Sequence, residues 1–374
     1  MIYDTKKLDL LLDSMDERFG VPACELIVRC GYDEIYHRVC GYSDHAKTMP
    51  ASENDVYWLF SETKLFTCVS AMQLVERGVI SLDDPVSKWL PEYADVTVMK
   101  DGNAVPCENV MTIRHLMSMT GGLSYDLDVP EIAGMRKSGA STREMVRIMA
   151  GVPLQFEPGT HFRYSLCHDV LAAIIEVASG MDFYTYLRKN ICEPLGIENI
   201  GFIPDGVHNF SAQYKFYDED RMTRPVETEN RYRLTENYCS GGAGLWSTAK
   251  DYILLPEALA NGGVGRNGNR IIMPESIDEM RKHLLTGSQK AEFNQMKRKT
   301  YSYGLGVRVR VTEGRCGEPV GEFGWDGACG AYDLVDTVNK LSIHYVQHIQ
   351  TPYFWCSDFH DELRETIYGC FINN

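Results

Sequence analysis

The segment LFSETKLFTCVSAMQLVER, residues 59–77, places a serine directly before a long amphipathic pattern. Apolar residues recur in this segment at the spacing of one helical face, and Gly78 supplies a stop. These apolar residues are Leu65, Cys68, Val69, Met72 and Val75. The pattern predicts a helix over residues 64–77 with Ser61 at its start.

The pair Ser61 and Lys64 has the spacing of a nucleophile and its activating amine. Residues three positions apart on a helix lie one turn apart on the same side, so the Lys64 amine is expected beside the Ser61 hydroxyl. Free N–H groups at a helix start favour a developing oxyanion. Burial and a cationic neighbour lower the pKa of a lysine until it can accept or relay a proton.

A Ser-x-x-Lys pattern alone is weak, because a second copy occurs at Ser247 and Lys250. There, Thr248 and Asp251 have capping-box spacing, so we interpret the second copy as the start of another helix. A helix-cap interpretation of Ser61 stays open until other motifs are considered.

Strand-like runs occur at both ends of the chain. Residues 25–30 and 34–41 flank the turn sequence GYD and predict a hairpin. Further strands are predicted at residues 303–311, 320–323, 331–336 and 341–347, with helices at 5–18 and 357–371. The middle of the chain is mainly helical, with helices predicted at residues 64–77, 113–119, 142–150, 168–178, 183–190 and 249–261.

Strands from both chain ends predict one α/β domain over residues 1–374, in which an antiparallel sheet is flanked by helices. The sheet part is expected at about residues 1–60 and 286–374. A mainly helical lobe, at about 61–285, is inserted between them. Ligands prefer the crevice between such parts.

The charge balance disfavours two classes of partner. The chain has 52 acidic and 37 basic residues, a formal charge of -15, and no basic run. Phosphate backbones and anionic membranes are bound through clustered Lys and Arg, so neither nucleic acid nor a membrane is expected as a partner. A small-molecule substrate fits better, and the oligomeric state stays open.

The distribution of cysteines and the absence of certain motifs limit the disulfides, metals and cofactors that can be expected. The twelve cysteines are spread through the chain, no CxxC pair occurs, and the N-terminal residues lack a signal-peptide pattern, so we expect reduced thiols and a cytoplasmic protein. His344 and His348 have metal-like spacing but no third ligand, so no metal is expected. Nucleotide-binding glycine motifs are absent, and no cofactor is expected.

Several segments, in order, resemble the superfamily of class C β-lactamases, penicillin-binding DD-peptidases and family VIII carboxylesterases. They are LFSETKLFTC (59–68), SLDDPVSKWLPEY (81–93), MTIRHLMSMTGGLSYD (111–126), FEPGTHFRYSLCHDVLAAIIEVASG (156–180), EPLGIENIGF (193–202), GGAGLWSTAKDY (241–252) and FGWDGACGAY (323–332). The resemblance covers nearly the whole chain and implies a β-lactamase/transpeptidase-like fold.

The resemblance also implies roles for individual residues. Ser61 matches the acylated nucleophile, Lys64 its lysine partner, and Tyr164 the tyrosine of the second motif, Tyr-x-Asn. A phenol becomes a usable base when a nearby cation favours its phenolate, so Tyr164 is expected to take the Ser61 proton and return it to the leaving group.

The third motif of the superfamily, Lys-Thr-Gly or His-x-Gly, corresponds to residues 324–328. Gly327 keeps the glycine, where the lack of a Cβ lets substrate lie against the backbone. The resemblance implies that the N–H groups of Ala328 and Ser61 form an oxyanion hole. Trp325 and Asp326 are expected to contact substrate beside them.

Two departures from the superfamily pattern favour an esterase. Leu166 replaces the substrate-contacting Asn of the second motif and is expected beside the substrate. Trp325 removes the third-motif cation from the region where β-lactams place a carboxylate. We therefore expect a serine hydrolase acting on small carboxylic esters, or amides, through an acyl-enzyme. A β-lactamase or D-amino-acid peptidase, an acyltransferase, and a non-catalytic binding or self-assembling protein stay as alternatives.

Overall fold

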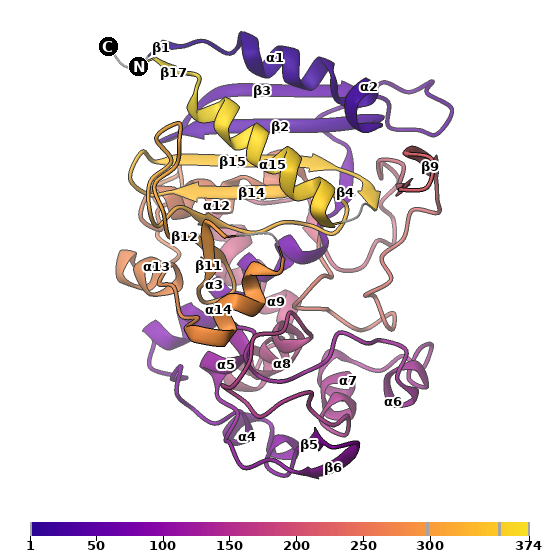
Figure 1. Ribbon diagram of the computed structural model, residues 1–374, viewed down its shortest axis with the longest axis vertical. Coiled ribbons are helices and arrows are strands. Elements are labelled where there is room, and N and C mark those ends of the chain that lie inside the picture. The colour runs from indigo at the N-terminus through magenta and orange to yellow at the C-terminus, as the bar shows by residue number, and fades with distance from the viewer. Residues whose placement is uncertain (1, 297–298, 351–352, 373–374) are drawn as a thin grey trace.

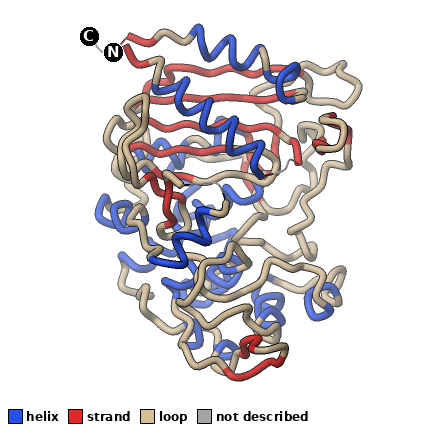
Figure 2. The backbone as a smooth tube through the Cα atoms, viewed as in Figure 1, coloured by secondary structure: helices blue, strands red, loops and turns tan. Residues whose placement is uncertain are grey.

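The computed structural model describes residues 2–296, 299–350 and 353–372. Within these residues, seven strands form one antiparallel sheet in the order β11-β12-β13-β14-β15-β2-β3 (Figures 1 and 2). The strands are β2 (Ala23–Cys30), β3 (Asp33–Gly41), β11 (Tyr301–Tyr303), β12 (Arg308–Arg310), β13 (Phe323–Gly324), β14 (Tyr332–Asp336) and β15 (Leu341–Gln347). The predicted antiparallel sheet from both chain ends is confirmed, since β15 pairs with β2.

Alternation along β2 explains how helices cover both faces of the sheet. Leu26 and Val28 pack in a cluster with α1 (Lys6–Asp13) and α15 (Tyr353–Tyr368), whereas Ile27 packs with α11 (Ala249–Tyr252) on the opposite face. Next to α11, α12 (Leu254–Ala260) contacts β14 and β15. In Figure 1, α15 crosses in front of the strands, α1 lies along the β3 edge at the top, and α12 lies behind the strands.

The mainly helical part of the molecule surrounds α3 (Thr63–Glu76) and α8 (Cys167–Ser179). Its other helices are α4 (Val86–Trp89), α5 (Ile113–Met117), α6 (Pro130–Ala133), α7 (Thr142–Met149), α9 (Phe183–Leu187), α10 (Glu193–Leu195), α13 (Pro274–Met280) and α14 (Gly287–Asn294). Short helical turns are η1 (Phe60–Glu62), η2 (Pro91–Tyr93) and η3 (Arg188–Cys192), and α2 (Met15–Phe19) follows α1. The proposed division into a sheet part and a lobe stays a prediction.

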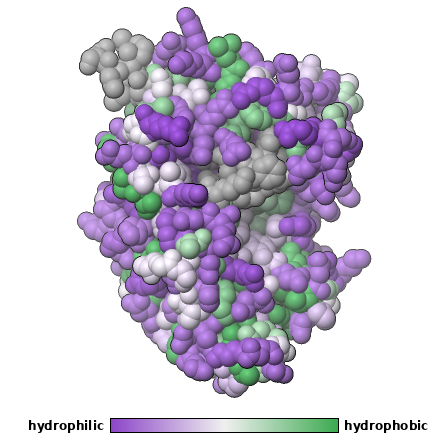
Figure 3. All heavy atoms as spheres, viewed as in Figure 1, coloured by the Kyte–Doolittle hydropathy of each residue, from purple (hydrophilic) through white to green (hydrophobic). Residues whose placement is uncertain are grey.

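Four small sheets complete the described secondary structure. They are β4 (Val56–Trp58) with β10 (Trp246–Thr248) and β7 (Ile200–Gly201); β5 (Thr97–Lys100) with β6 (Asn103–Pro106); β16 (Ile349–Gln350) with β8 (Tyr214–Tyr217) and β9 (Met222–Pro225); and β1 (Ile2–Tyr3) with β17 (Phe371–Ile372). The visible face of the molecule is mostly hydrophilic (Figure 3).

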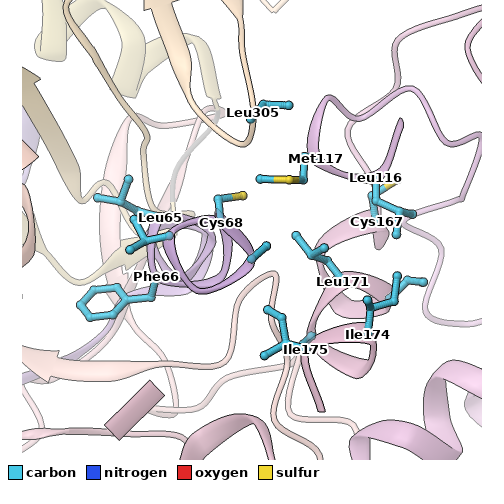
Figure 4. Close-up of a cluster of buried hydrophobic side chains, with 14 of the residues drawn as sticks. Leu65, Phe66, Cys68, Leu116, Met117, Cys167, Leu171, Ile174, Ile175 and Leu305 are labelled. Carbon is cyan, nitrogen blue, oxygen red and sulfur yellow. The ribbon is translucent and has the colours of Figure 1, made fainter. Parts of the chain in front are cut away.

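Helix α3 is more deeply buried than its amphipathic pattern predicts. All residues from Thr63 to Leu74 are buried, because α8 packs against one side of the helix and the loops and strands of the sheet part enclose the others. Figure 4 shows Leu171 facing α3, with Met117 of α5 pointing toward Cys68. A helix buried on all sides holds its N-terminal end rigidly.

Several predicted elements are interrupted in the structure. The strand expected over residues 303–311 is a hairpin of β11 and β12, and its turn contains Gly306 at a φ of +82°. A Cβ there would lie 2.1 Å from Cys68 Sγ, so only glycine lets the turn approach α3. The strand expected at residues 320–323 begins at Phe323, because Gly321 makes a turn at a φ of +88°. The helix expected over residues 249–261 is divided between α11 and α12.

In the described part of the chain, no single helix is long and apolar enough to cross a membrane. Helix α8 and the helical residues 183–195 reach that length and composition only together, across a bend of 77°.

Candidate active site

Ser61 lies in η1, immediately before α3, as the amphipathic pattern predicts. The preceding Phe60 has a φ of +50°, a left-handed conformation that an aromatic residue rarely adopts. Such strain persists only where the surroundings hold it in place, and it is common at functional sites. The turn leaves the Ser61 side chain at a cavity, with 8% of the residue exposed.

Lys64 is fully buried beside Ser61. Its Nζ lies 3.3 Å from Ser61 Oγ and donates a 2.5 Å hydrogen bond to the carbonyl of Gly242. Burial lowers the pKa of this amine to about 7, against an opposing contribution from Asp169. At neutral pH a large fraction of the amine is therefore unprotonated and able to accept a proton from the hydroxyl.

Tyr164, which precedes α8, completes a cluster from three parts of the chain. Its ring stacks between Tyr125 and Trp325, with centroid distances of 5.5 and 5.4 Å. Lys64 Nζ lies 4.5 Å from the Tyr164 ring centroid, and Trp325 Nε1 donates a 2.9 Å hydrogen bond to the phenolic oxygen. The structure thus brings Ser61, Lys64 and Tyr164 together, while their catalytic roles stay a prediction.

The segment after β13 is held against the turn that carries Ser61. Gly327 N–H donates to Ala331 O at 2.8 Å, and a Cβ on Gly327 would lie 2.6 Å from the carbonyl oxygen of Leu59. Glycine is therefore required for this close approach. Ala328 is exposed next to it and lines the same cavity as Ser61, where the expected oxyanion hole would form.

Asp326 forms an ion pair with a buried arginine. Arg308 Nη1 donates to its carboxylate at 2.8 Å, and the same guanidinium contacts the carbonyl of Asp333. Arg308 is fully buried and Asp326 is 8% exposed, so this ion pair largely neutralises the charge of Asp326 at the cavity. Asp326 lines the cavity, and its expected contact with substrate stays a prediction.

A cavity of about 370 Å³ opens over Ser61. Its wall is largely aromatic, and its lining residues are Ser61, Tyr125, Tyr164, Arg231, Tyr232, Met296, Trp325, Asp326, Gly327 and Ala328. The aromatic rings suit an apolar acyl or alcohol group, and Ser61 lines the cavity while the Lys64 amine is buried beside its hydroxyl.

Leu166 was expected at the substrate, but the structure does not bring it to this cavity. Its side chain is buried in the hydrophobic core, with 4% of the residue exposed, and it directly precedes α8. Its N–H donates to Ser124 O, and this backbone contact belongs to the entry into α8. Leu166 therefore contributes to packing at the start of the helix.

A family model described as Beta-lactamase matches residues 8–358. The chain belongs to this beta-lactamase family. The match, together with the similar proteins described next, supports the conclusion that this chain is an enzyme of the group of beta-lactamase-fold serine hydrolases and acyltransferases. The expected β-lactamase/transpeptidase-like fold is confirmed.

One curated relative and two solved structures are similar to this chain. Esterase EstB from Burkholderia gladioli is 28% identical over 370 residues, which cover 90% of this chain and 88% of EstB. The structure of EstCE1, a hydrolase with promiscuous acyltransferase activity, matches with a TM-score of 0.81 at 24% identity, covering 98% of both chains. Unliganded simvastatin synthase (LovD) from Aspergillus terreus matches with a TM-score of 0.83 at 23% identity, covering 99% of this chain and 100% of LovD.

The second Ser-x-x-Lys copy is a helix start, as predicted. Thr248 Oγ1 accepts a hydrogen bond from the N–H of Asp251 at the beginning of α11. Ser247 Oγ donates to Asn199 O, and Lys250 Nζ donates to Asn54, so this serine and lysine face other partners. The copy provides matched controls for substitutions at Ser61 and Lys64.

The two histidines with metal-like spacing make interior contacts. His344 Nε2 lies 3.2 Å from Glu62 Oε2, and His348 Nδ1 donates to Ser211 O at 2.8 Å. In the residues described here, no group of three or more His, Cys, Asp or Glu side chains is arranged to hold a metal ion.

The sequence did not point to four residues at or near the site. Arg231 and Met296 line the cavity from loops that no motif marks. Gly242 and Asp169 adjoin Lys64 from the interior. Asp169 could have been found from the sequence, because it is an acidic residue within the apolar pattern of the helix after Tyr164.

Substituting Trp325 with phenylalanine is expected to lower kcat for ester hydrolysis about tenfold with little change in KM, because a hydrogen bond that orients the Tyr164 oxygen is lost while most of the ring stacking remains. Steady-state kinetics would measure both constants. Trp246→Phe is the matched control, since its indole N–H donates to Ile203 O at 3.0 Å outside the cavity. Equal kcat values for both variants would contradict a role for this contact.

Proposed function

We propose that this protein is a carboxylesterase that acts through an acyl-enzyme on Ser61. The observation that carries the proposal is the buried Lys64 amine, whose pKa is lowered to about 7, 3.3 Å from a hydroxyl at the floor of an aromatic cavity. Trp325 supports an ester over a β-lactam, because it places an indole where the superfamily has a cation. The esterase named among the relatives supports the same choice.

Acylation follows from the positions of the three groups. Ser61 Oγ forms a bond to the ester carbonyl carbon, and its proton passes to the neutral Lys64 amine. The bond to the alcohol breaks, the alcohol oxygen takes the phenolic proton of Tyr164, and Lys64 returns a proton to Tyr164. Sequence reasoning gave the first proton transfer to Tyr164; the Lys64–Ser61 distance favours Lys64 for it.

Deacylation repeats these steps with water as the nucleophile. Lys64 again accepts a proton, now from water, whose oxygen bonds to the acyl carbon. The bond from that carbon to Ser61 Oγ breaks, Oγ takes the phenolic proton of Tyr164, and Lys64 returns a proton to Tyr164. During both steps, negative charge on the carbonyl oxygen is assigned to the N–H groups of Ser61 and Ala328. Gly327 sets the distance between them, since it packs against the backbone at Leu59.

The test compares 4-nitrophenyl butyrate with nitrocefin on the same enzyme preparation. We expect kcat/KM for the ester to exceed that for nitrocefin by at least about 100-fold, because no free cation of the third motif binds the lactam carboxylate. Absorbance assays follow both reactions. Faster nitrocefin hydrolysis would reverse the assignment in favour of a β-lactamase.

An acyltransferase is the second candidate, favoured by an adjoining cavity. This polar cavity, of about 550 Å³, shares Arg231, Tyr232 and Ala328 with the site over Ser61 and has room for an acceptor alcohol. The structural neighbour EstCE1 is named as a hydrolase with promiscuous acyltransferase activity. Formation of butyl butyrate when the ester assay contains 1-butanol would distinguish transfer from hydrolysis.

A further inference from the structure

A buried carboxylate, Asp169 of α8, faces the Lys64 amine across a glycine. A Cβ built on Gly242 would lie 2.7 Å from Asp169 Oδ2 and 3.5 Å from Lys64 Nζ. Both atoms are thus within 3.5 Å of one point that no side chain occupies. Gly242 therefore leaves the carboxylate and the amine facing each other in the interior.

The hydrogen bonds of Asp169 favour its ionised form. Tyr238 Oη and Ser240 Oγ each donate to Oδ1 at 2.6 Å, and Gly242 N–H approaches the same oxygen at 3.5 Å. Burial raises the pKa of Asp169, and these donors, directed at the carboxyl group, oppose that effect by stabilising its charge. Oδ2 is buried and has no hydrogen-bond partner within the described ranges, so its charge is directed at the interior that holds Lys64.

The other titratable groups around Lys64 do not supply a negative charge at neutral pH. Burial raises the pKa of the thiols of Cys68 and Cys167, and burial lowers the pKa of His168 to about 3, so all three are neutral. The rings of Tyr125 and Tyr164 present their faces to the amine. Among the described residues whose charges act on Lys64, Asp169 is the carboxylate, and its negative charge opposes the effect of burial on the amine.

We propose that Asp169 is a positioning residue that holds the positive charge of Lys64 after the amine has taken the proton of Ser61. The proposal rests on the acyl-enzyme route described above. Asp169 acts in two ways: it faces the amine with Oδ2, and through Oδ1 it fixes the segment of Tyr238 to Gly242, whose last carbonyl accepts the amine hydrogen bond.

The physical reason is the low polarity of the site. Proton transfer from Ser61 creates an ammonium group that water does not reach, since Lys64 is fully buried. A fixed carboxylate nearby stabilises this ammonium and needs no reorganisation when the proton arrives. Asp169 therefore makes Lys64 a stronger proton acceptor than burial alone would allow.

The test is Asp169→Asn, which keeps the shape and an oxygen for Tyr238 and Ser240 but removes the charge. The rate of Ser61 labelling by a fluorophosphonate is measured from pH 5 to 9, and mass spectrometry locates the adduct. In the unmodified protein the rate is expected to rise with pH to a midpoint near 7, as Lys64 loses its proton. Without the carboxylate the ammonium is less stable, so the midpoint is expected about one pH unit lower and the plateau rate about tenfold lower.

Glu176→Gln is the matched control, because this carboxylate lies on the same helix and accepts from Phe183 N–H, away from Lys64. It is expected to leave the midpoint in place. If Asp169→Asn does not fold, Gly242→Ala gives the answer, since its methyl group would separate Oδ2 from Nζ and lower the midpoint.

The outcomes separate this inference from the proposed function. An adduct on Ser61 with an unchanged midpoint in the folded Asp169→Asn or Gly242→Ala variant would overturn the role of Asp169 and leave the esterase proposal standing. Absence of any adduct on Ser61 in the unmodified protein would instead refute the acyl-enzyme, and with it both proposals.

Discussion

Substituting Ser61 with alanine is expected to lower kcat/KM for 4-nitrophenyl butyrate by about 10⁴-fold or more, because the atom that bonds to the acyl group is removed. The Ser61 hydroxyl is small and 8% exposed, and its removal disturbs little packing. A melting temperature close to that of the unmodified protein would show that the loss is chemical. Release of 4-nitrophenol measures the activity.

Ser247→Ala provides the matched control. Ser247 belongs to the second Ser-x-x-Lys copy and its hydroxyl is used in a buried hydrogen bond to Asn199 O at 2.8 Å. This variant is expected to keep its kcat/KM and to lose about 1 kcal/mol of stability. Retained turnover in Ser61→Ala would rule out the proposed nucleophile.

Substituting Lys64 with methionine is expected to lower kcat by about 10³-fold, because the proton of Ser61 loses its acceptor. The folded protein holds the amine at a pKa of about 7 against an ordinary value of 10.5, so below pH 10.5 burial of the ammonium opposes folding. Methionine has a similar length and removes this cost, but it leaves the Gly242 carbonyl and the Asp169 carboxylate without the amine. The two effects oppose each other, so a small change in Tm at pH 7 is expected.

Lys250→Met tests whether removing the lysine of the other Ser-x-x-Lys copy also lowers kcat. Lys250 Nζ donates to Asn54 Oδ1 at the surface. Its substitution is expected to leave kcat unchanged. A Lys64→Met enzyme that keeps normal kcat and its pH dependence would show that another group accepts the serine proton.

Local spacing was sufficient to predict that Ser61 and Lys64 lie side by side in the site. The three-residue interval between Ser61 and Lys64 fixes their proximity once residues 64–77 are helical, because both the helix and the contact are short-range. The strands at both chain ends were likewise visible as local patterns. Tyr164 and Trp325, separated by 161 residues, were assigned to the site through the resemblance, and the contact between them was not predicted.

The parts that sequence reasoning missed depend on contacts that no local pattern encodes. Leu166 sits where the superfamily places a substrate-binding amide, but the turn into α8 directs its side chain into the core. Asp169 is a lone acid in an apolar helix, and its partners Tyr238 and Ser240 come about 70 residues later. Gly306 divides a predicted strand because Cys68 approaches it from a distant helix.

The pairing of β2 with β15 has a consequence for how the molecule is made. Residues 24–30 pair with residues 341–347 in the large sheet, so a strand near the start of the chain obtains its neighbour only when a strand near the end has been synthesised. Contacts of such long sequence separation slow folding. A ribosome that stops before about residue 347 therefore releases a chain whose first hairpin lacks its neighbour, with an open edge that invites association with other chains.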